Sequence, residues 1–275
     1  MTIQSLVDNE TRSACEAEHG LSLLVTLASG FRVLFDMGHG TCFAENASRL
    51  GIDLSGVDLA VISHGHHDHG GGLETFLQRN TQAPVYVHRR AFEPHFSLKT
   101  NGLKSISLDG ALQGHPRLVW CDGLTCITSD MLLFGDVPEH FPRPEANRTL
   151  LGPDRQPDDF AHEQSLLLRE NGRWVLLAGC AHAGAVNILE KAERIVGQSV
   201  SLMIGGMHLK TAMDGLSDAP DRRPGLQRLA DALLQHTGCT FCTMHCTGMD
   251  AYRALKACMG DRMRYLGCGE IITFD

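Results

Sequence analysis

The chain has 275 residues, of which 43% are hydrophobic and 20% charged, so a disordered or fibrous chain is excluded. Its 32 acidic residues outnumber the 24 basic ones, and the net charge of −8 argues against a general nucleic-acid binder, which needs a basic face. The composition includes fifteen histidines and ten cysteines, and histidine is the commonest metal ligand in proteins. These counts direct the search for a function towards a metal site.

The N-terminal sequence does not predict a secretory signal. The first twenty residues are polar and acidic, without the apolar core of such a signal, and no apolar stretch elsewhere reaches the roughly 18 residues of a membrane span. We therefore expect a cytoplasmic protein that binds a small molecule and neither nucleic acid nor a membrane; the oligomeric state is not indicated. In that compartment the cysteines are expected to be buried thiols or metal ligands.

The first half of the chain alternates short apolar strands with helices. A hairpin is predicted around Ser29-Gly30, because two β-rich apolar stretches flank these turn residues. The elements expected over this half are strands at 21–28, 31–37, 58–63, 85–88, 118–120 and 126–128, and helices at 42–50 and 73–78.

The second half begins with a loop and then returns to alternating strands and helices. Residues 135–160 hold five of the ten prolines and little hydrophobic periodicity, which predicts an insertion loop near a substrate site. The elements expected after it are strands at 165–169, 174–178, 200–204, 240–244 and 271–274, and helices at 183–196, 225–236 and 249–259. Because no linker divides the chain, we expect residues 1–275 to form a single domain with sheets inside and helices outside.

The segment 63–70, SHGHHDHG, is the strongest functional signal. It follows an apolar strand, and Gly65 with the glycines at 70–72 supplies the backbone freedom that a tight loop needs. Such a turn lets His64, His66, Asp68 and His69 converge, and imidazole and carboxylate ligands suit zinc, iron or manganese. A solvated histidine-rich loop is the alternative interpretation.

This loop resembles the His-x-His-x-Asp-His hallmark of the metallo-β-lactamase superfamily. The resemblance implies an α/β fold, an αββα sandwich of two mixed sheets with outer helices, and one or two metal ions at the sheet edge. The segment 35–38, FDMG, looks like the first superfamily motif, in which Asp36 would brace the metal loop. A simple turn-forming role at the strand end is the alternative for Asp36.

The same resemblance divides the ligands between two ions. His64 and His66 would hold one ion and Asp68 and His69 the other, with one downstream histidine for each. His182 follows an apolar strand that would aim it at the same edge, although a helix-capping histidine fits too, and His245 looks like the last histidine motif. These downstream residues complete the implied ligand set.

His208 and Cys180 are two further candidates for the site. His208 also follows an apolar strand, and we expect it to face the substrate as a catalytic or supporting residue. Typical superfamily members bridge two metals with an aspartate at a strand end, whereas this chain has Cys180 after Gly179. Either Cys180 or His182 takes that role, or the second metal is weak or absent.

Two enzymatic functions and one binding function follow. The first is a hydrolase in which one or two zinc ions, or manganese or iron, activate water against an ester, phosphoester or lactone. Asp68 would orient that water or accept its proton.

A di-iron redox protein fits poorly, because the chain has no room for a fused flavin domain. A metal-binding protein without turnover is the third possibility.

The second enzymatic function comes from a narrower resemblance. The segments GCAHAGAVNIL, GGMHL and HCTG, together with Glu163-Gln164, are similar to a subgroup that includes dihydropterin-methyl-aminobenzene ribofuranosyl phosphate synthases. That resemblance implies transfer of a pterin group to an aromatic amine with release of pyrophosphate. A solvated hairpin entry is the alternative for Glu163-Gln164. Basic residues available for a phosphorylated substrate are Arg143, Arg148, Arg155 and Lys210.

The remaining histidines and cysteines are expected to be ordinary. Cys239, Cys242 and Cys246 could form a zinc knot, but alternation along a strand sends the first to the opposite face, so buried thiols are preferred. Seven histidines have no convergent partner in the sequence, at positions 19, 39, 88, 95, 115, 140 and 236.

Overall fold

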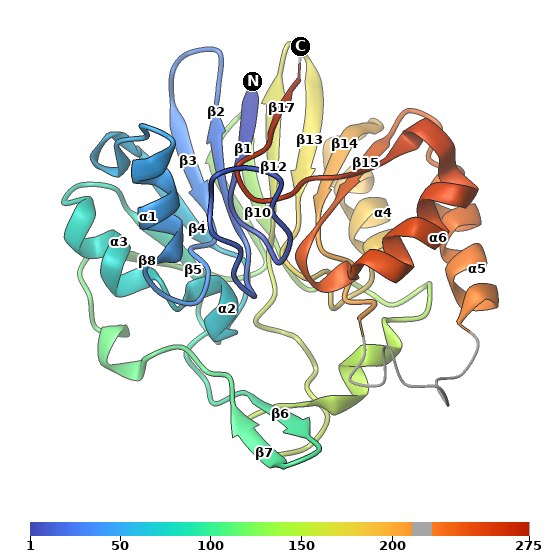
Figure 1. Cartoon of the computed structure of the whole chain (residues 1–275), viewed down its shortest axis with the longest axis horizontal. Coiled ribbons are helices and arrows are strands. Elements are labelled where there is room, and N and C mark those ends of the chain that lie inside the picture. Colours follow the sequence, from blue (N-terminus) through green and yellow to red (C-terminus); the bar gives the residue numbers. More distant parts are fainter. Residues whose placement is uncertain (211–221, 275) are drawn as a thin grey trace.

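The computed structural model describes residues 1–210 and 222–274, and its strands form two large sheets that pack face to face (Figure 1). In spatial order, the first sheet contains β17 (Ile271–Thr273), β1 (Thr2–Val7), β2 (Ser22–Thr26), β3 (Arg32–Phe35), β4 (Leu59–Ile62), β5 (Val85–His88) and β8 (Leu118–Cys121). The second contains β16 (Met263–Tyr265), β15 (Thr240–Thr243), β14 (Val200–Gly205), β13 (Arg173–Leu177), β12 (Ser165–Glu170), β10 (Met131–Phe134) and β9 (Leu124–Thr128).

The helices cover the outer faces of the two sheets (Figure 1). Outside the first sheet lie α1 (Cys42–Arg49) and α3 (Leu73–Arg79), and the short α2 (His67–Gly70) lies at its edge. Outside the second sheet lie α4 (Ala185–Val196), α5 (Arg223–Leu234) and α6 (Met249–Met259). Buried apolar side chains form one cluster between the sheets and one under each helical layer. The expected αββα sandwich is therefore confirmed.

The strand directions decide where polar residues gather. In the first sheet β3, β4, β5 and β8 are parallel, and in the second β13, β14, β15 and β16 are parallel. The carboxyl ends of parallel strands lie at the same edge of a sheet, which is where ligands bind in open α/β sheets. The loops that follow β3, β4, β13, β14 and β15 carry the motifs found in the sequence.

Several elements differ from the prediction. Strands β1, β10 and β16 were not expected, and residues 96–105 form a small hairpin of β6 (Phe96–Lys99) and β7 (Gly102–Ser105). The proline-rich loop contains a short 3-10 helix (Glu145–Thr149) and β11 (Leu150–Leu151), which pairs with β6, so it is more ordered than expected. Within residues 1–210 and 222–274, no helix is both long and apolar enough to cross a bilayer.

Candidate metal centre

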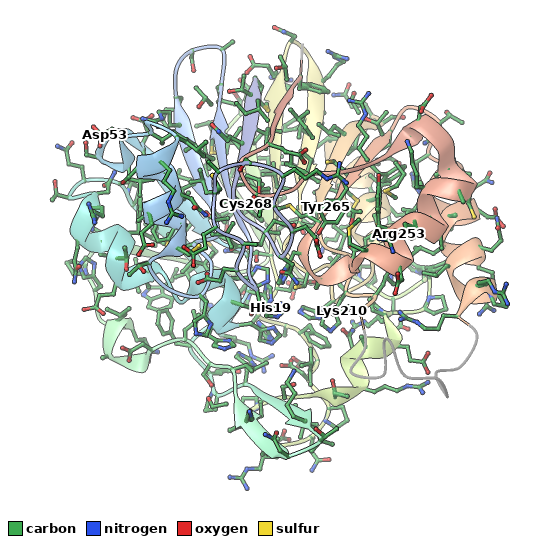
Figure 2. The ribbon with its side chains drawn as sticks, in the orientation of Figure 1. His19, Asp53, Lys210, Arg253, Tyr265 and Cys268 are labelled. Atoms are coloured by element: carbon green, nitrogen blue, oxygen red, sulfur yellow. The ribbon has the colours of Figure 1, made fainter. Side chains whose placement is uncertain are left out.

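The strand ends bring the sequence motifs together at one edge of the sandwich. Asp36 follows β3, the histidine-rich loop follows β4, and His182, His208 and His245 follow β13, β14 and β15 in turn. Figure 2 shows nitrogen-bearing side chains crowded at this edge, close to the labelled His19 and Lys210. All the residues expected from the sequence to form the site therefore gather in one region.

Asp36 holds the histidine-rich loop in place. It is fully buried and has a φ of 61°, an unusual backbone angle that turns its side chain into the loop. Its Oδ1 accepts the Ser63 amide at 2.7 Å, and its Oδ2 accepts the Ser63 hydroxyl and His69 Nδ1, each at 2.7 Å. This is the bracing contact expected from the sequence.

His64, His66 and His182 form a first group, in which ring nitrogens without hydrogen-bond partners lie close together. Because the Ser63 hydroxyl donates to Asp36, its oxygen accepts His64 Nδ1 at 2.8 Å. Asn147 donates its amide to the His182 carbonyl at 2.8 Å, so its Oδ1 accepts His182 Nδ1 at 3.0 Å. Nε2 of both histidines is then an acceptor, and among the described residues neither these two atoms nor His66 Nε2 has a hydrogen-bond partner. Ligand atoms of the three histidines lie within 4.8 Å of one another.

A second group lies beside the first. His69 donates Nδ1 to Asp36, and His245 donates Nδ1 to Asn9 Oδ1 at 2.8 Å, so the two Nε2 atoms, 3.2 Å apart, are both acceptors. Asp68 Oδ2 lies 3.4 Å from His245 Nε2. Two lone pairs and a carboxylate at such distances repel unless a cation lies between them. Against the effect of burial, the charges of Asp36 and Asp68 raise the pKa of His69, so a proton can serve as that cation.

The residues that support the second group come from the polar N-terminal segment. Asp8 Oδ1 accepts the His245 amide at 2.5 Å and Oδ2 accepts the Tyr265 hydroxyl at 2.8 Å. Asn9 contacts both His245 and His19, and His19 Nε2 lies 3.3 Å from Asp68 Oδ2. The expectation that His19 is an ordinary histidine is therefore wrong. Sequence reasoning missed these partners because more than 230 residues separate Asp8 and Asn9 from His245.

Burial sets the protonation of the first group. It is the largest effect on the pKa of His64, His66 and His182, and together with the neighbouring histidines it holds each well below 6.5. These imidazoles are therefore neutral at neutral pH, which is the form that binds metals. The residues present thus fit a divalent cation bound through nitrogen.

Glu163 and Phe160 fix the loop that carries His182. The Glu163 carboxylate accepts the amides of His182 and Ala183 at 2.7 and 2.8 Å. Burial outweighs these two hydrogen bonds and raises the pKa of Glu163 to about 7. The Phe160 ring stacks on the His182 ring with centroids 4.4 Å apart. Glu163 therefore shapes the site through the backbone and is not a solvated residue.

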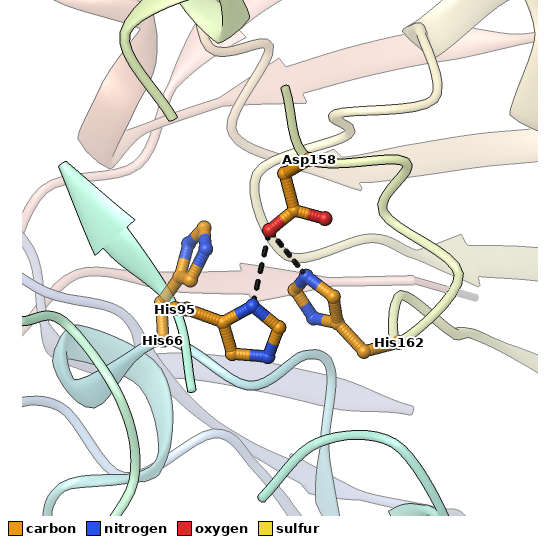
Figure 3. A group of neighbouring side chains, drawn as sticks. All are labelled: His66, His95, Asp158 and His162. Carbon is orange, nitrogen blue, oxygen red and sulfur yellow. Dashed lines mark hydrogen bonds and ion pairs between the residues drawn. The ribbon is translucent and has the colours of Figure 1, made fainter. Parts of the chain in front are cut away.

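A buried cluster of three further residues, His95, Asp158 and His162, lies beside His66 (Figure 3). Gly65 donates its amide to His162 Nδ1 at 2.9 Å, so His162 carries its proton on Nε2, which lies 3.3 Å from Asp158 Oδ2. His95 Nδ1 reaches the same oxygen at 3.0 Å. Because both nitrogens of His162 are occupied, the cluster fits a hydrogen-bond network that positions the loop better than it fits a cation site.

This network was not predicted. His95 was expected to lack a convergent partner, which is wrong, and neither His162 nor Asp158 was considered. Asp158 lies inside the proline-rich loop, so only the folded chain brings it to the histidines.

The cysteines divide between the core and the site. Cys239 packs in the core between the second sheet and its helices, and Cys242 packs between the sheets, so these two are buried thiols as expected. Cys246 instead follows β15 on a 3-10 turn, and its Sγ accepts the His208 amide at 3.2 Å. Cys246 and Cys180 both lie within 4.8 Å of a His245 nitrogen. Cys246 is a buried thiol as expected, but it lies at the site instead of in the core, because the chain leaves the strand before reaching it.

A cavity of about 860 Å³ lies beside the loop that carries His182, and we call it the arginine-rimmed cavity. Asn147 and Phe160, which contact His182, form part of its wall, as do residues of the proline-rich loop. Its basic lining residues are Arg143, Arg148, Arg222 and Arg228, and its apolar ones include Phe141, Pro142, Met207, Leu209, Leu226 and Leu229. Of the four bases expected to meet a substrate, Arg155 and Lys210 do not line it in the described part of the chain.

Comparison with known proteins places this geometry in a family. The uncharacterized protein MJ0448 of Methanocaldococcus jannaschii is 25% identical over 259 residues, covering 92% of this chain and 93% of that protein. The 7,8-dihydropterin-6-methyl-4-(beta-D-ribofuranosyl)-aminobenzene-5'-phosphate synthase of the same organism is 27% identical over 285 residues, covering 94% of this chain and 90% of that protein.

The crystal structure of Tm1679, a metal-dependent hydrolase, matches with a TM-score of 0.81 and 26% identity, covering 100% of this chain and 99% of that one. The sequence profile of the metallo-beta-lactamase superfamily matches residues 16–186, which include the braced loop and His182. The chain therefore belongs to the metallo-β-lactamase superfamily.

Proposed function

We propose that residues 1–275 form a single-domain, cytoplasmic, metal-dependent hydrolase that binds one or two zinc ions and acts on a small ester, phosphoester or lactone. The observation that carries this proposal is the set of imidazole nitrogens at the strand ends, which in His64, His69, His182 and His245 are fixed as acceptors by a donor bond from the other ring nitrogen. His64, His66 and His182 would hold one ion, and Asp68, His69 and His245 the other.

The chain's own residues suggest how the reaction would run. A bound zinc ion would supply a Lewis acid and lower the pKa of water at the site to about 7. Asp68 is the available proton acceptor, since its side chain is 13% exposed and its Oδ2 faces the second histidine group. His208, whose ring centroid lies 4.3 Å from that of His182, would contact the substrate.

The arginine-rimmed cavity is the proposed substrate site. Its apolar wall suits the body of an organic molecule, and its arginines can contact an anionic group, although Arg143 is paired with Glu139 and Arg148 with Glu145 at the same wall. An anionic group of the substrate would contact this rim and leave the scissile bond beside His182.

The test is metal analysis combined with a substrate screen. Purified protein would be stripped with a chelator, reloaded with zinc, and assayed against aryl esters, lactones and phosphodiesters. We expect activity that zinc restores and that Asp68→Asn abolishes while the ion proposed for His64, His66 and His182 stays bound. Activity that survives complete removal of metal would contradict the proposal.

Group transfer is the second candidate function, and the similarity to the dihydropterin-aminobenzene phosphate synthase favours it. In this reaction an aromatic amine or ring carbon would displace pyrophosphate from an activated pterin, and the arginine rim would hold the leaving group. Incubation with a dihydropterin diphosphate separates the two functions. Pyrophosphate release that requires the aromatic partner supports transfer, whereas release in its absence supports hydrolysis.

A further inference from the structure

Cys180 lies where the two histidine groups meet. Its Sγ is 3.1 Å from His69 Nε2 and within 4.8 Å of a nitrogen of His64, His182 and His245. The side chain is buried, with 3% of its surface exposed. One sulfur atom therefore lies within 4.8 Å of ligands proposed for both ions.

The backbone holds this sulfur in position. Gly179 precedes it, and a Cβ at that residue would come within 2.2 Å of Ser63 Oγ, so the end of β13 is pressed against the loop that carries His64. The Gly206 amide donates to the Gly179 carbonyl at 2.8 Å, and Ala181 follows with a φ of 54°. Contacts on both sides thus fix where Cys180 points.

Without Cys180, the proposed ligands supply little negative charge to balance two divalent ions. Among the six proposed ligands Asp68 is the only acid, so two divalent ions would bring four positive charges against one negative charge. The aspartate that typically bridges the metals in the superfamily is absent from this strand end. A thiolate supplies one negative charge, and zinc accepts sulfur at about 2.3 Å and imidazole nitrogen at about 2.0–2.1 Å.

We propose that Cys180 Sγ bridges the two metal ions as a thiolate, in place of the family's aspartate. The proposal rests on the metal centre of the proposed function. On binding, the thiol loses its proton to solvent and the sulfur forms one bond to each ion, with no oxidation or reduction. Bonds of the lengths above at a tetrahedral ion place a sulfur and a nitrogen ligand about 3.5 Å apart, so the 3.1 Å between Cys180 Sγ and His69 Nε2 must widen only slightly to admit an ion.

Cobalt(II) tests the proposal, because a thiolate bound to cobalt gives a charge-transfer absorption in the near ultraviolet that imidazole and carboxylate do not give. Chelator-stripped protein would be titrated with cobalt chloride alone, following both absorption and bound metal. We expect two ions per chain and a sulfur band in the wild type. Cys180→Ser should lose the band and bind the second ion about tenfold or more weakly.

Three variants keep the test informative if Cys180→Ser is unstable. Cys180→Asp restores the family's carboxylate and should bind two ions without the band. Cys246→Ser removes the neighbouring sulfur and should keep the band, as should Cys126→Ser at an exposed position. A band that disappears in Cys246→Ser but persists in Cys180→Ser overturns the assignment.

The wild type separates this inference from the function on which it rests. Two bound ions without a sulfur band overturn the bridge and leave the hydrolase proposal standing. Two ions with the band but no hydrolysis overturn the hydrolase proposal and support the bridge. A protein that binds no cobalt overturns both.

Discussion

Gly65 separates two proposed metal ligands, and replacing it with alanine tests whether the loop is as tightly held as the structure indicates. A Cβ at this residue would lie 2.3 Å from the Ala91 carbonyl oxygen and 2.7 Å from His95 Nε2. The first neighbour is backbone and cannot rotate away, so the loop itself must move. That movement separates the Gly65 amide from His162.

The expected cost of Gly65→Ala can be worked from these contacts. Overpacking of a well-packed interior costs about 1–3 kcal/mol, and loss of one hydrogen bond costs about 0.5–1.5 kcal/mol. Together they predict that the free energy of unfolding of the metal-free protein falls by about 2–4 kcal/mol. Displaced ligands should also weaken zinc binding about tenfold or more, since each factor of ten corresponds to about 1.4 kcal/mol.

Urea denaturation of the stripped protein and zinc competition with a chromophoric chelator measure the two effects. Gly110→Ala is the matched control, because a Cβ there meets no described atom within 4 Å and its φ is not positive. We expect the control to stay within about 0.5 kcal/mol of the wild type. If Gly65→Ala matches the control in both measurements, the reasoning about the loop is refuted.

Three further predictions follow from other contacts. The histidine partners of Asp158 hold its pKa below 3.8 against the effect of burial, so its stabilising contribution disappears when it is protonated. Asp158→Asn should therefore destabilise the protein above about pH 4 and progressively less below that pH. A difference in urea midpoint that does not change with pH would argue against this. Asn147→Ala should weaken zinc binding about 10–100-fold in the chelator assay, because it removes the hydrogen-bond partner of His182 Nδ1. Asn147→Asp keeps an acceptor oxygen and should recover most of that loss. Phe241 lies in the core under the helices, so Phe241→Ala should lower the free energy of unfolding by about 3–5 kcal/mol in thermal or urea unfolding. Ile271→Ala, at an exposed position, should lower it by less than about 0.5 kcal/mol. Equal losses would contradict the assigned burial.

The sequence predicted the residues that lie at strand ends. His64, His182 and His245 each follow an apolar strand, and the rule that parallel strands end at one edge is enough to bring them together. Asp36 was found in the same way, through a short motif at the end of its strand. For such residues the local pattern carries the spatial information.

The residues that orient the ligands could not be predicted in this way. Asn9, Asn147, Asp158 and His162 have no spacing that marks them, and they lie in segments read as polar or irregular. Their positions depend on tertiary contacts such as the pairing of β11 with β6, which no local pattern encodes. Strand β1 was missed because its polar residues interrupt the apolar run, although β2 and β17 pair with it on either side.

The contact between Asn9 and His245 affects the order in which the protein can mature during synthesis. Domains begin to fold from the N-terminal end as the chain emerges, so Asn9 is available long before its partner. His245 becomes available only after β15, the next-to-last strand of the second sheet, has been made. The second histidine group therefore assembles only after His245 has been synthesised, and loading of the ion proposed for it would be a late step.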